Sequence, residues 1–248
     1  TTTARTARVV ANDGANSSLS RDVTINVVAI NNPPSISITA SPLSFVENGA
    51  PMVIDSAVVP IELDSVAYVG GSYQISLQGA TISVSPWFAG EDKLIYTSTA
   101  GIGATIDQAT GVLRMTAITT LANYQTALRA IQYQNTSDNP TTGSRVVTFT
   151  VTDGASTSSA TRTINVTAVN DAPTADLSGP VATGNNHSTT YRTSVGSIPI
   201  AYSTSTVTDP DNATMTSLTV TIANVQNLNN EVLTYTLPGG ISASAPSN

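Results

Sequence analysis

The stretch that decides the fold occurs twice: "VVANDGANSSLSRDVTINVVAINNPP" at residues 9–34 returns as "FTVTDGASTSSATRTINVTAVNDAP" at residues 149–173. The Asp-Gly pair at 13–14 aligns with that at 153–154, and after one deleted residue the Ile-Asn-Val at 25–27 aligns with that at 164–166. Self-similarity at a long, fixed period is the signature of tandem domains. The sequence therefore predicts an array of similar units, and arrays of this kind span distance and present surfaces.

The internal match predicts the boundaries of these repeats. Residues 35–173 form one complete repeat, residues 1–34 are the last strands of a preceding repeat, and residues 174–248 begin a following one. In the third segment "IPI" at 198–200 corresponds to "VPI" at 59–61, at the same offset as the two Ile-Asn-Val triplets. Because the chain is out of phase with its repeats, we expect it to be part of a longer array.

Alternation of apolar and polar residues dominates the chain, and this period of two is typical of half-buried strands. Strands are predicted in eight segments: 21–30, 35–39, 80–84, 92–97, 144–153, 161–169, 218–222 and 232–237. Asp-Gly, Gly-Gly, Asn-Asn and Pro-Pro pairs separate such segments as turns. Many short strands with frequent turns predict an all-β fold of tandem antiparallel Greek-key β-sandwiches.

One segment of the complete repeat has helical periodicity instead. Within residues 119–133, apolar side chains recur at spacings of three and four, at Leu121, Tyr124, Leu128 and Ile131. This stripe predicts one short amphipathic helix that packs against its own sandwich. A threonine at position 119 or 120 can cap its start.

The composition excludes several classes of function. Charged residues make up 10% of the chain, and the net charge is −7 with 16 acidic against nine basic residues. Such an acidic chain is not expected to bind nucleic acid or an anionic membrane. There is no cysteine, and no apolar run approaches the length of a membrane span. His187, the one histidine, lies in a polar stretch with no catalytic motif around it, so we expect a protein that is not an enzyme.

Several motifs together resemble those of cadherin-like repeats. They are "VTDGASTSSATRTINVTAVNDAP" (151–173), "GATIDQATGVLRM" (103–115), "STVTDPDNATM" (205–215) and "SFVENGA" (44–50). The unit length and "ANYQTALRAIQYQNTSDNP" (122–140) are similar to the cadherin-like or immunoglobulin-like repeats of giant bacterial surface proteins and adhesins. The resemblance covers essentially the whole chain. It implies a secreted, extracellular location at a bacterial cell surface.

The resemblance also implies that calcium binds between successive repeats and stiffens the linker. Carried over residue by residue, the ligands at the 173/174 junction would be Glu47, Asn170, Asp171, Asp209, Asp211 and Asn212. Carboxylate and amide oxygens are the ligands that Ca²⁺ prefers. The alternative is ordinary turn chemistry, since Asp, Asn and Gly gather in loops for backbone reasons alone.

The chain departs from the family pattern at both junctions. Ala168 and Ala172 replace an acid and an asparagine of the second linker. At the first junction the linker reads Asn31-Asn32, and "VGGSY" (69–73) falls where an Asp-x-Asp motif is expected, with Asp64 as the one acid nearby. The sequence therefore favours calcium at the second junction over the first.

The function predicted from these observations is that of a stalk or spacer, whose partners are neighbouring repeats, copies of the same protein or a cell-surface glycan or protein ligand. One alternative is a self-assembling filament or surface-lattice subunit, in which the strands at 5–12 and 20–30 complete the sandwich of another copy. Another is a carbohydrate-binding module that uses Trp87, Phe88 and nearby tyrosines. The other interpretation of Trp87 is that it caps the sandwich core, and we favour this interpretation over sugar binding.

Overall fold

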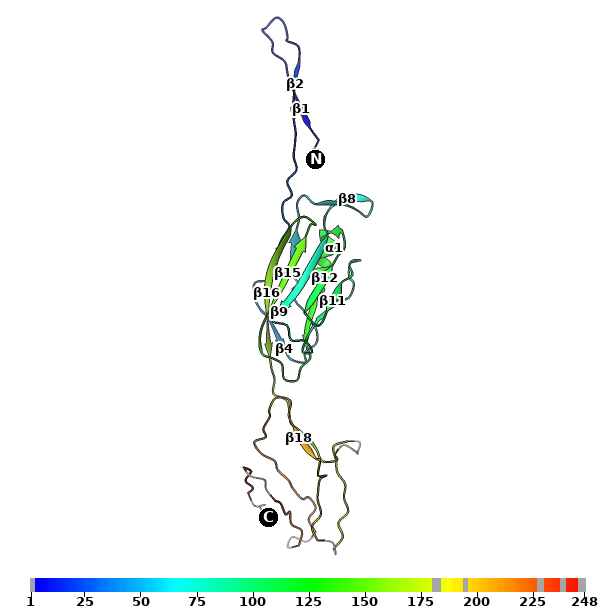
Figure 1. Ribbon diagram of the computed structural model, residues 1–248, viewed down its shortest axis with the longest axis vertical. Coiled ribbons are helices and arrows are strands. Elements are labelled where there is room, and N and C mark those ends of the chain that lie inside the picture. The colour runs from blue at the N-terminus through cyan, green and yellow to red at the C-terminus, as the bar shows by residue number, and fades with distance from the viewer. Residues whose placement is uncertain (1–2, 180–183, 194–195, 227–229, 237–239, 245–248) are drawn as a thin grey trace. The chain divides into compact units, whose positions relative to one another are not determined.

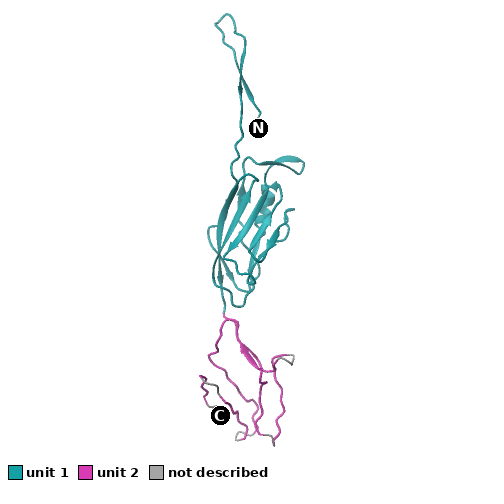
Figure 2. Cartoon of the chain, viewed as in Figure 1, with its two compact units in different colours: residues 1–169 teal, residues 170–248 magenta. Residues whose placement is uncertain are grey.

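The computed structural model describes residues 3–179, 184–193, 196–226, 230–236 and 240–244. Contacts divide the chain into two units, unit 1 at residues 1–169 and unit 2 at residues 170–248 (Figure 2). Unit 1 thus contains both the first hairpin and nearly all of the predicted complete repeat. The repeat boundaries at 34/35 and 173/174 remain predictions.

A six-stranded sheet forms one layer of unit 1 (Figure 1). Its strands, in spatial order, are β11 (Thr105–Asp107), β12 (Val112–Met115), β9 (Gly79–Ser85), β15 (Gly143–Thr152), β16 (Thr157–Thr167) and β4 (Leu43–Val46). All pairs are antiparallel except β16 with β4, which is parallel. The predicted strands at 80–84, 144–153 and 161–169 are confirmed by β9, β15 and β16.

Shorter strands complete the sandwich. They are β10 (Asp92–Ile95), β14 (Gln132–Asn135) and β5 (Met52–Val53) in one sheet, β13 (Thr119–Thr120), β8 (Ser72–Leu77) and β7 (Val66–Val69) in another, and the pair β3 (Ser35–Ser37) and β6 (Val59–Ile61). The predicted strands at 35–39 and 92–97 are confirmed by β3 and β10. The core between the layers contains Phe45, Leu77, Ile82, Leu113, Tyr133, Phe149 and Ile164, all fully buried. The chain is an all-β protein of the β-sandwich class.

The predicted helix is confirmed as α1 (Leu121–Leu128). Thr120 is its N-cap, and its side chain accepts a hydrogen bond from the amide of Asn123. Tyr124 and Leu128 are fully buried in the core, so the apolar stripe packs against its own sandwich as expected.

A buried polar group lies among the strands of unit 1. Arg145 of β15 and Asp92 of β10 form an ion pair, with 3.3 Å between Nε and Oδ2, and both are almost fully buried. The same carboxylate accepts hydrogen bonds from the Tyr133 hydroxyl at 2.5 Å and from the Asn135 amide at 3.0 Å. The Arg145 guanidinium also lies 4.5 Å from the ring centroid of Phe88. Charges can be buried only when they are paired and hydrogen-bonded in this way.

The strands β1 (Arg5–Val9) and β2 (Arg21–Ile25) form an antiparallel hairpin. Every residue of this hairpin is exposed, including Val9 at 56% and Ile25 at 50%. The strand predicted at 21–30 therefore extends only to residue 25.

Unit 2 contains one strand pair among its described residues, β17 (Thr174–Asp176) with β18 (Thr206–Thr208). The strands predicted at 218–222 and 232–237 were wrong for the described residues: 218–222 and 232–236 have no strand partner, and residue 237 lies outside the description. Leu218 is 72% exposed and Val232 is 69% exposed. An alternating segment forms a strand only when a neighbour takes up its backbone hydrogen bonds.

Candidate metal centre

A buried glutamate follows strand β6 in unit 1. Glu62 is only 4% exposed, and its Oε1 accepts hydrogen bonds from the amides of Leu63, Asp64 and Ser65 at 2.8, 2.9 and 3.0 Å. Its other oxygen, Oε2, is buried with no hydrogen-bond partner among the residues that the structure describes. A buried carboxylate oxygen without a partner is costly, and a bound cation would remove that cost.

The next acidic residue connects Glu62 to the linker that precedes the complete repeat. Asp64 Oδ2 accepts hydrogen bonds from the backbone amide of Asn32 at 2.9 Å and from its side-chain amide at 2.7 Å. One carboxylate therefore fixes both the main chain and the side chain of the linker residue.

A second acidic loop also contacts this linker. Asp153 Oδ2 accepts a hydrogen bond from the side chain of Asn31 at 2.9 Å, and its Oδ1 accepts from the amides of Ala155 and Ser156. Burial alone would raise the pKa of Asp153, but the amide of Ser156, the Asn31 side chain and the amide of Ala155 outweigh it and hold the pKa below its ordinary value. Asp153 is therefore a carboxylate at neutral pH. We call the five residues Asn31, Asn32, Glu62, Asp64 and Asp153 the N-terminal cluster.

Unit 2 contains a matching arrangement after its own first strand pair. Asp209 Oδ1 accepts hydrogen bonds from the amides of Asp211 and Asn212 at 2.9 and 2.7 Å. Asp211 Oδ2 accepts from the amide of Asp171 at 2.5 Å. The side chain of Asn212 donates to Asn170 Oδ1 at 3.3 Å. Five of the six predicted calcium ligands are thus brought together within unit 2.

The strand pairings show that the two arrangements are equivalent. Ser35 pairs with Ile61 in β3–β6, and Thr174 pairs with Thr208 in β17–β18. Position 62 therefore corresponds to position 209, and position 64 to position 211. In both places the first acid accepts amides two and three residues later, and the second acid accepts the amide of the second linker residue.

This equivalence corrects two expectations from the sequence. The Asp-x-Asp position of the complete repeat is occupied by Glu62-Leu63-Asp64, whereas the segment at 69–73 forms the turn of the β7–β8 hairpin, with Gly70 and Gly71 at φ of 60° and 92°. Likewise, the partner of β17 is β18 at 206–208, and not "IPI" at 198–200. An alignment at a constant offset missed both equivalences, because the connection between the paired strands is longer in unit 2. This connection runs from 38 to 58 in unit 1 and from 177 to 205 in unit 2.

The sixth predicted ligand, Glu47, lies at the end of β4 in unit 1. It is 6% exposed, and its Oε1 accepts a hydrogen bond from the amide of Val169 at 2.7 Å. Its Oε2 is buried and has no hydrogen-bond partner in the described part of the chain. A joint site of Glu47 with the five residues of unit 2 stays a prediction.

The aromatic residues predicted to stack on sugars have contacts of their own. The Trp87 side chain is partly buried against the core, and its Nε1 donates to the carbonyl of Gln108 at 2.9 Å. A Cβ added to Gly111 would clash with the Trp87 ring, so the ring lies directly on that glycine. Phe88 is partly buried beneath the Arg145 guanidinium. The favoured reading of Trp87, as a cap of the core, agrees with these contacts.

Two other aromatic contacts involve exposed side chains. Tyr68 and Tyr73, opposite each other in the β7–β8 hairpin, are 67% and 77% exposed, with ring centroids 5.3 Å apart. In unit 2 the His187 ring lies 4.9 Å from that of Tyr202 in an edge-on contact. The tyrosine pair was not predicted from the sequence, although a Gly-Gly turn between two tyrosines is a hairpin signal.

No protein-family profile matches the chain, and no curated protein matches it. Among solved structures, it is similar to the crystal structure of protocadherin gamma C5 EC1-3, with a TM-score of 0.29 and 14% identity. The match covers 84% of this chain and 55% of that one, so this chain spans about half the length of that fragment.

A second similar structure is the endo-fucoidan hydrolase MfFcnA4 from glycoside hydrolase family 107. Its TM-score is 0.20 at 14% identity, and the match covers 72% of this chain and 23% of that chain.

Among the described residues, no helix is long and apolar enough to cross a membrane.

Proposed function

We propose that this chain is a segment of a secreted, extracellular tandem-repeat protein that acts as a stalk or spacer at a bacterial cell surface, with no catalytic activity of its own. Its partners are neighbouring repeats. The single observation that carries the proposal is the recurrence of one local geometry, the acid pair and linker contacts at 62–64 and again at 209–211. Repeats that fix their linkers by the same contacts are suited to stand in series.

Calcium remains proposed for the acids of the 173/174 junction, and the N-terminal cluster offers the same kinds of donor. Its donors are carboxylate and amide oxygens, which hard cations prefer, and the chain contains no cysteine to favour a softer metal. The buried Oε2 of Glu62 is the atom that a cation would satisfy. A bound Ca²⁺ would supply positive charge at that oxygen. Such an ion would stiffen the linker, because the main chain that Glu62 Oε1 holds includes Asp64, which accepts hydrogen bonds from Asn32.

The substitution Glu62→Gln tests this site, because its expected effect on stability differs between the calcium-free and the calcium-bound chain. Glu62→Gln keeps the Oε1 acceptor but removes the buried charge, so without calcium the variant should be as stable as the unmodified chain or more stable. With calcium at about 100 times its Kd, the unmodified chain should gain about 2.7 kcal/mol and the variant should lose most of this gain. Thermal unfolding followed by the fluorescence of Trp87, with Ca²⁺ or with a chelator, measures both.

The matched control is Asp107→Asn. Asp107 also accepts hydrogen bonds from residues shortly after it, from the amide of Ala109 and the hydroxyl of Thr110, but it is the exposed last residue of β11. Its variant should keep the full calcium response. Asp209→Asn examines the arrangement in unit 2 in the same way, by calorimetric titration with Ca²⁺. A chain whose melting temperature and calorimetric signal are unchanged by Ca²⁺ would remove the calcium proposal.

A further inference from the structure

The β7–β8 hairpin of unit 1 places two tyrosines directly opposite each other. Tyr68 pairs with Tyr73, one position beyond the two residues that flank the turn. Gly70 and Gly71 form this turn, and their φ of 60° and 92° are both positive, as a two-residue type I′ turn requires. The pair next to such a turn is hydrogen-bonded and the following pair is not, so the side chains of the following pair lie closer together. The turn therefore brings the two phenol rings together.

The two rings contact each other, and their hydroxyl groups are free. The ring centroids lie 5.3 Å apart, with an angle of 68° between the planes. Tyr68 is 67% exposed and Tyr73 is 77% exposed, and neither hydroxyl group has a hydrogen-bond partner among the described residues. In contrast, Tyr124 and Tyr133 are buried and donate their hydroxyl hydrogens within the core. Tyr68 and Tyr73 are thus an adjacent pair of accessible phenols.

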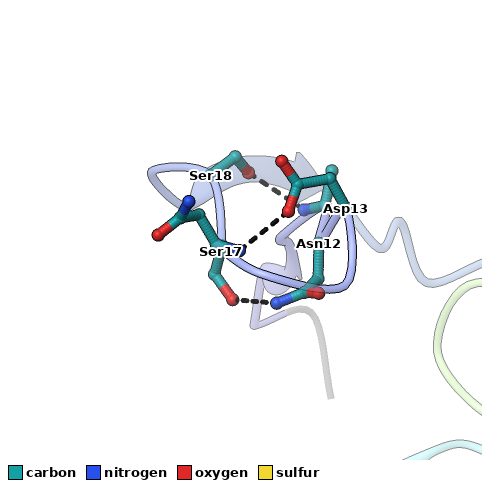
Figure 3. Close-up of a pocket in the computed structure, with 6 residues that line it drawn as sticks. Asn12, Asp13, Ser17 and Ser18 are labelled. Carbon is teal, nitrogen blue, oxygen red and sulfur yellow. Dashed lines mark hydrogen bonds between the residues drawn. The ribbon is translucent and has the colours of Figure 1, made fainter.

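The β1–β2 hairpin shows how side chains hold a turn of this protein closed. The side chain of Asn12 donates to Ser17 Oγ at 2.7 Å across that loop (Figure 3). The two glycines of the β7–β8 turn have no side chain to do the same, and Gln74 Nε2 supplies a longer bond to the carbonyl of Val69, at 3.3 Å. A two-stranded hairpin is only marginally stable by itself. A covalent link between its strands would keep the β7–β8 hairpin closed.

The composition of the chain leaves phenols as the groups for such a link. Extracellular proteins commonly join strands by disulfides, but this chain has no cysteine. For the same reason, no thiol of the chain can reduce a tyrosyl radical once it has formed. Two adjacent tyrosyl radicals then react with each other.

We propose that Tyr68 and Tyr73 are an oxidative crosslinking site, at which a peroxidase-type oxidant with hydrogen peroxide joins the two rings as a dityrosine. Each phenol gives up one electron and one proton, and one hydrogen peroxide takes up both pairs and becomes two waters. The two phenoxyl radicals form one carbon–carbon bond between ring carbons next to the hydroxyl-bearing carbons. The hydrogens on these carbons then move to the oxygens, which restores both phenols.

The geometry of the pair suits this step. A centroid separation of 5.3 Å is only slightly larger than that of two directly bonded rings, and exposed side chains change rotamer within nanoseconds. Holding two reacting groups side by side favours their reaction over an encounter between separate molecules. Both rings belong to one hairpin, so the site needs nothing from another repeat or another copy. The proposal also needs no calcium and is independent of the function proposed above.

Peptide mass measurement after oxidation tests the site. The dilute chain is treated with a peroxidase and hydrogen peroxide and then digested with trypsin, which releases residues 22–93. This fragment contains Tyr68 and Tyr73 and no other tyrosine. It should become lighter by two hydrogen atoms, and the chain should gain dityrosine fluorescence while it remains a monomer. A fragment that shows no such loss, or a product in which two fragments are joined to each other, would overturn the proposal.

Variants distinguish this pair from the other tyrosines. Tyr73→Phe should lose the crosslink and its fluorescence. Adding Gln74→Tyr to Tyr73→Phe restores the number of tyrosines but moves one to the opposite face of the strand, so the crosslink should stay absent. The matched control is Tyr235→Phe, at a position that is 57% exposed, and it should keep the full crosslink. Equal fluorescence from Tyr73→Phe and from the unmodified chain would refute the inference.

Discussion

Replacing Arg145 by leucine is expected to lower the free energy of unfolding of unit 1 by about 3–5 kcal/mol, one of the two largest effects that the structure predicts. Arg145 is 1% exposed and supplies the positive charge that faces the buried carboxylate of Asp92. Its Nη1 also donates to the carbonyl of Thr141 at 2.7 Å. Without the guanidinium, the carboxylate stays buried with the neutral donors of Tyr133, Asn135 and the Phe88 amide.

Urea unfolding followed by the fluorescence of Trp87 measures this loss, since that one tryptophan lies in unit 1. Arg114→Leu is the matched control, because Arg114 is an exposed arginine on strand β12 and its loss should change stability by less than about 0.5 kcal/mol. The double variant with Asp92→Leu should recover much of the loss, because no unpaired charge remains. If Arg145→Leu and Arg114→Leu proved equally stable, the ion pair would have no structural role.

Unit 1 is expected to lose about 4–5 kcal/mol of stability between pH 10 and pH 12 through two buried tyrosines. Burial raises the pKa of Tyr124 to about 12, and burial together with the hydrogen bond to Asp92 raises the pKa of Tyr133 as well. Both folded-state values lie above the unfolded value of about 10. Above pH 10 the folded chain therefore holds more protons than the unfolded chain, and stability falls as the pH rises towards the folded pKa values.

Urea midpoints between pH 8 and pH 12 measure the slope. Tyr124→Phe and Tyr133→Phe should each flatten it, since phenylalanine has no proton to lose. Tyr68→Phe is the control, because Tyr68 is 67% exposed and should leave the slope unchanged. A stability profile that is flat above pH 10 in the unmodified chain would contradict the burial of the two hydroxyl groups.

The fold was predictable from the sequence where an apolar–polar pattern continues over many neighbouring residues. The strands β15 and β16 have ten and eleven residues, so alternation identified them over several periods, and Thr120 with the apolar stripe identified α1. The predicted strands were wrong for the described residues 218–222 and 232–236 because alternation does not report whether a partner strand is present. The β7–β8 hairpin was missed because its Gly-Gly turn was assigned by alignment to another motif.

The candidate site was predictable only in part. The acids of unit 2 follow a recognisable Asp-x-Asp pattern. Glu62 and Asp64 make the same hydrogen bonds, but the first acid of their triplet is a glutamate. The longer connection between the paired strands of unit 2 hid this match from an alignment at constant offset. The signal that could have found it is an acid-x-acid triplet directly after the short strand "VPI". The orphan oxygen of Glu62 depends on three-dimensional packing and has no sequence signature.

The parallel pairing of β4 with β16 determines how the complete repeat bears mechanical load. Leu43 to Val46 lie beside Ile164 to Thr167 in the same direction, and the amide of Glu47 adds a hydrogen bond to the carbonyl of Thr167. A pull on the two ends of the repeat draws β4 backwards and β16 forwards, along their own axes. The hydrogen bonds between them then lie across the force and must rupture together, whereas a hairpin pulled apart at its ends opens one bond at a time. In a protein that bears tension along its chain, this pair of strands would act as a shear clamp within the sandwich.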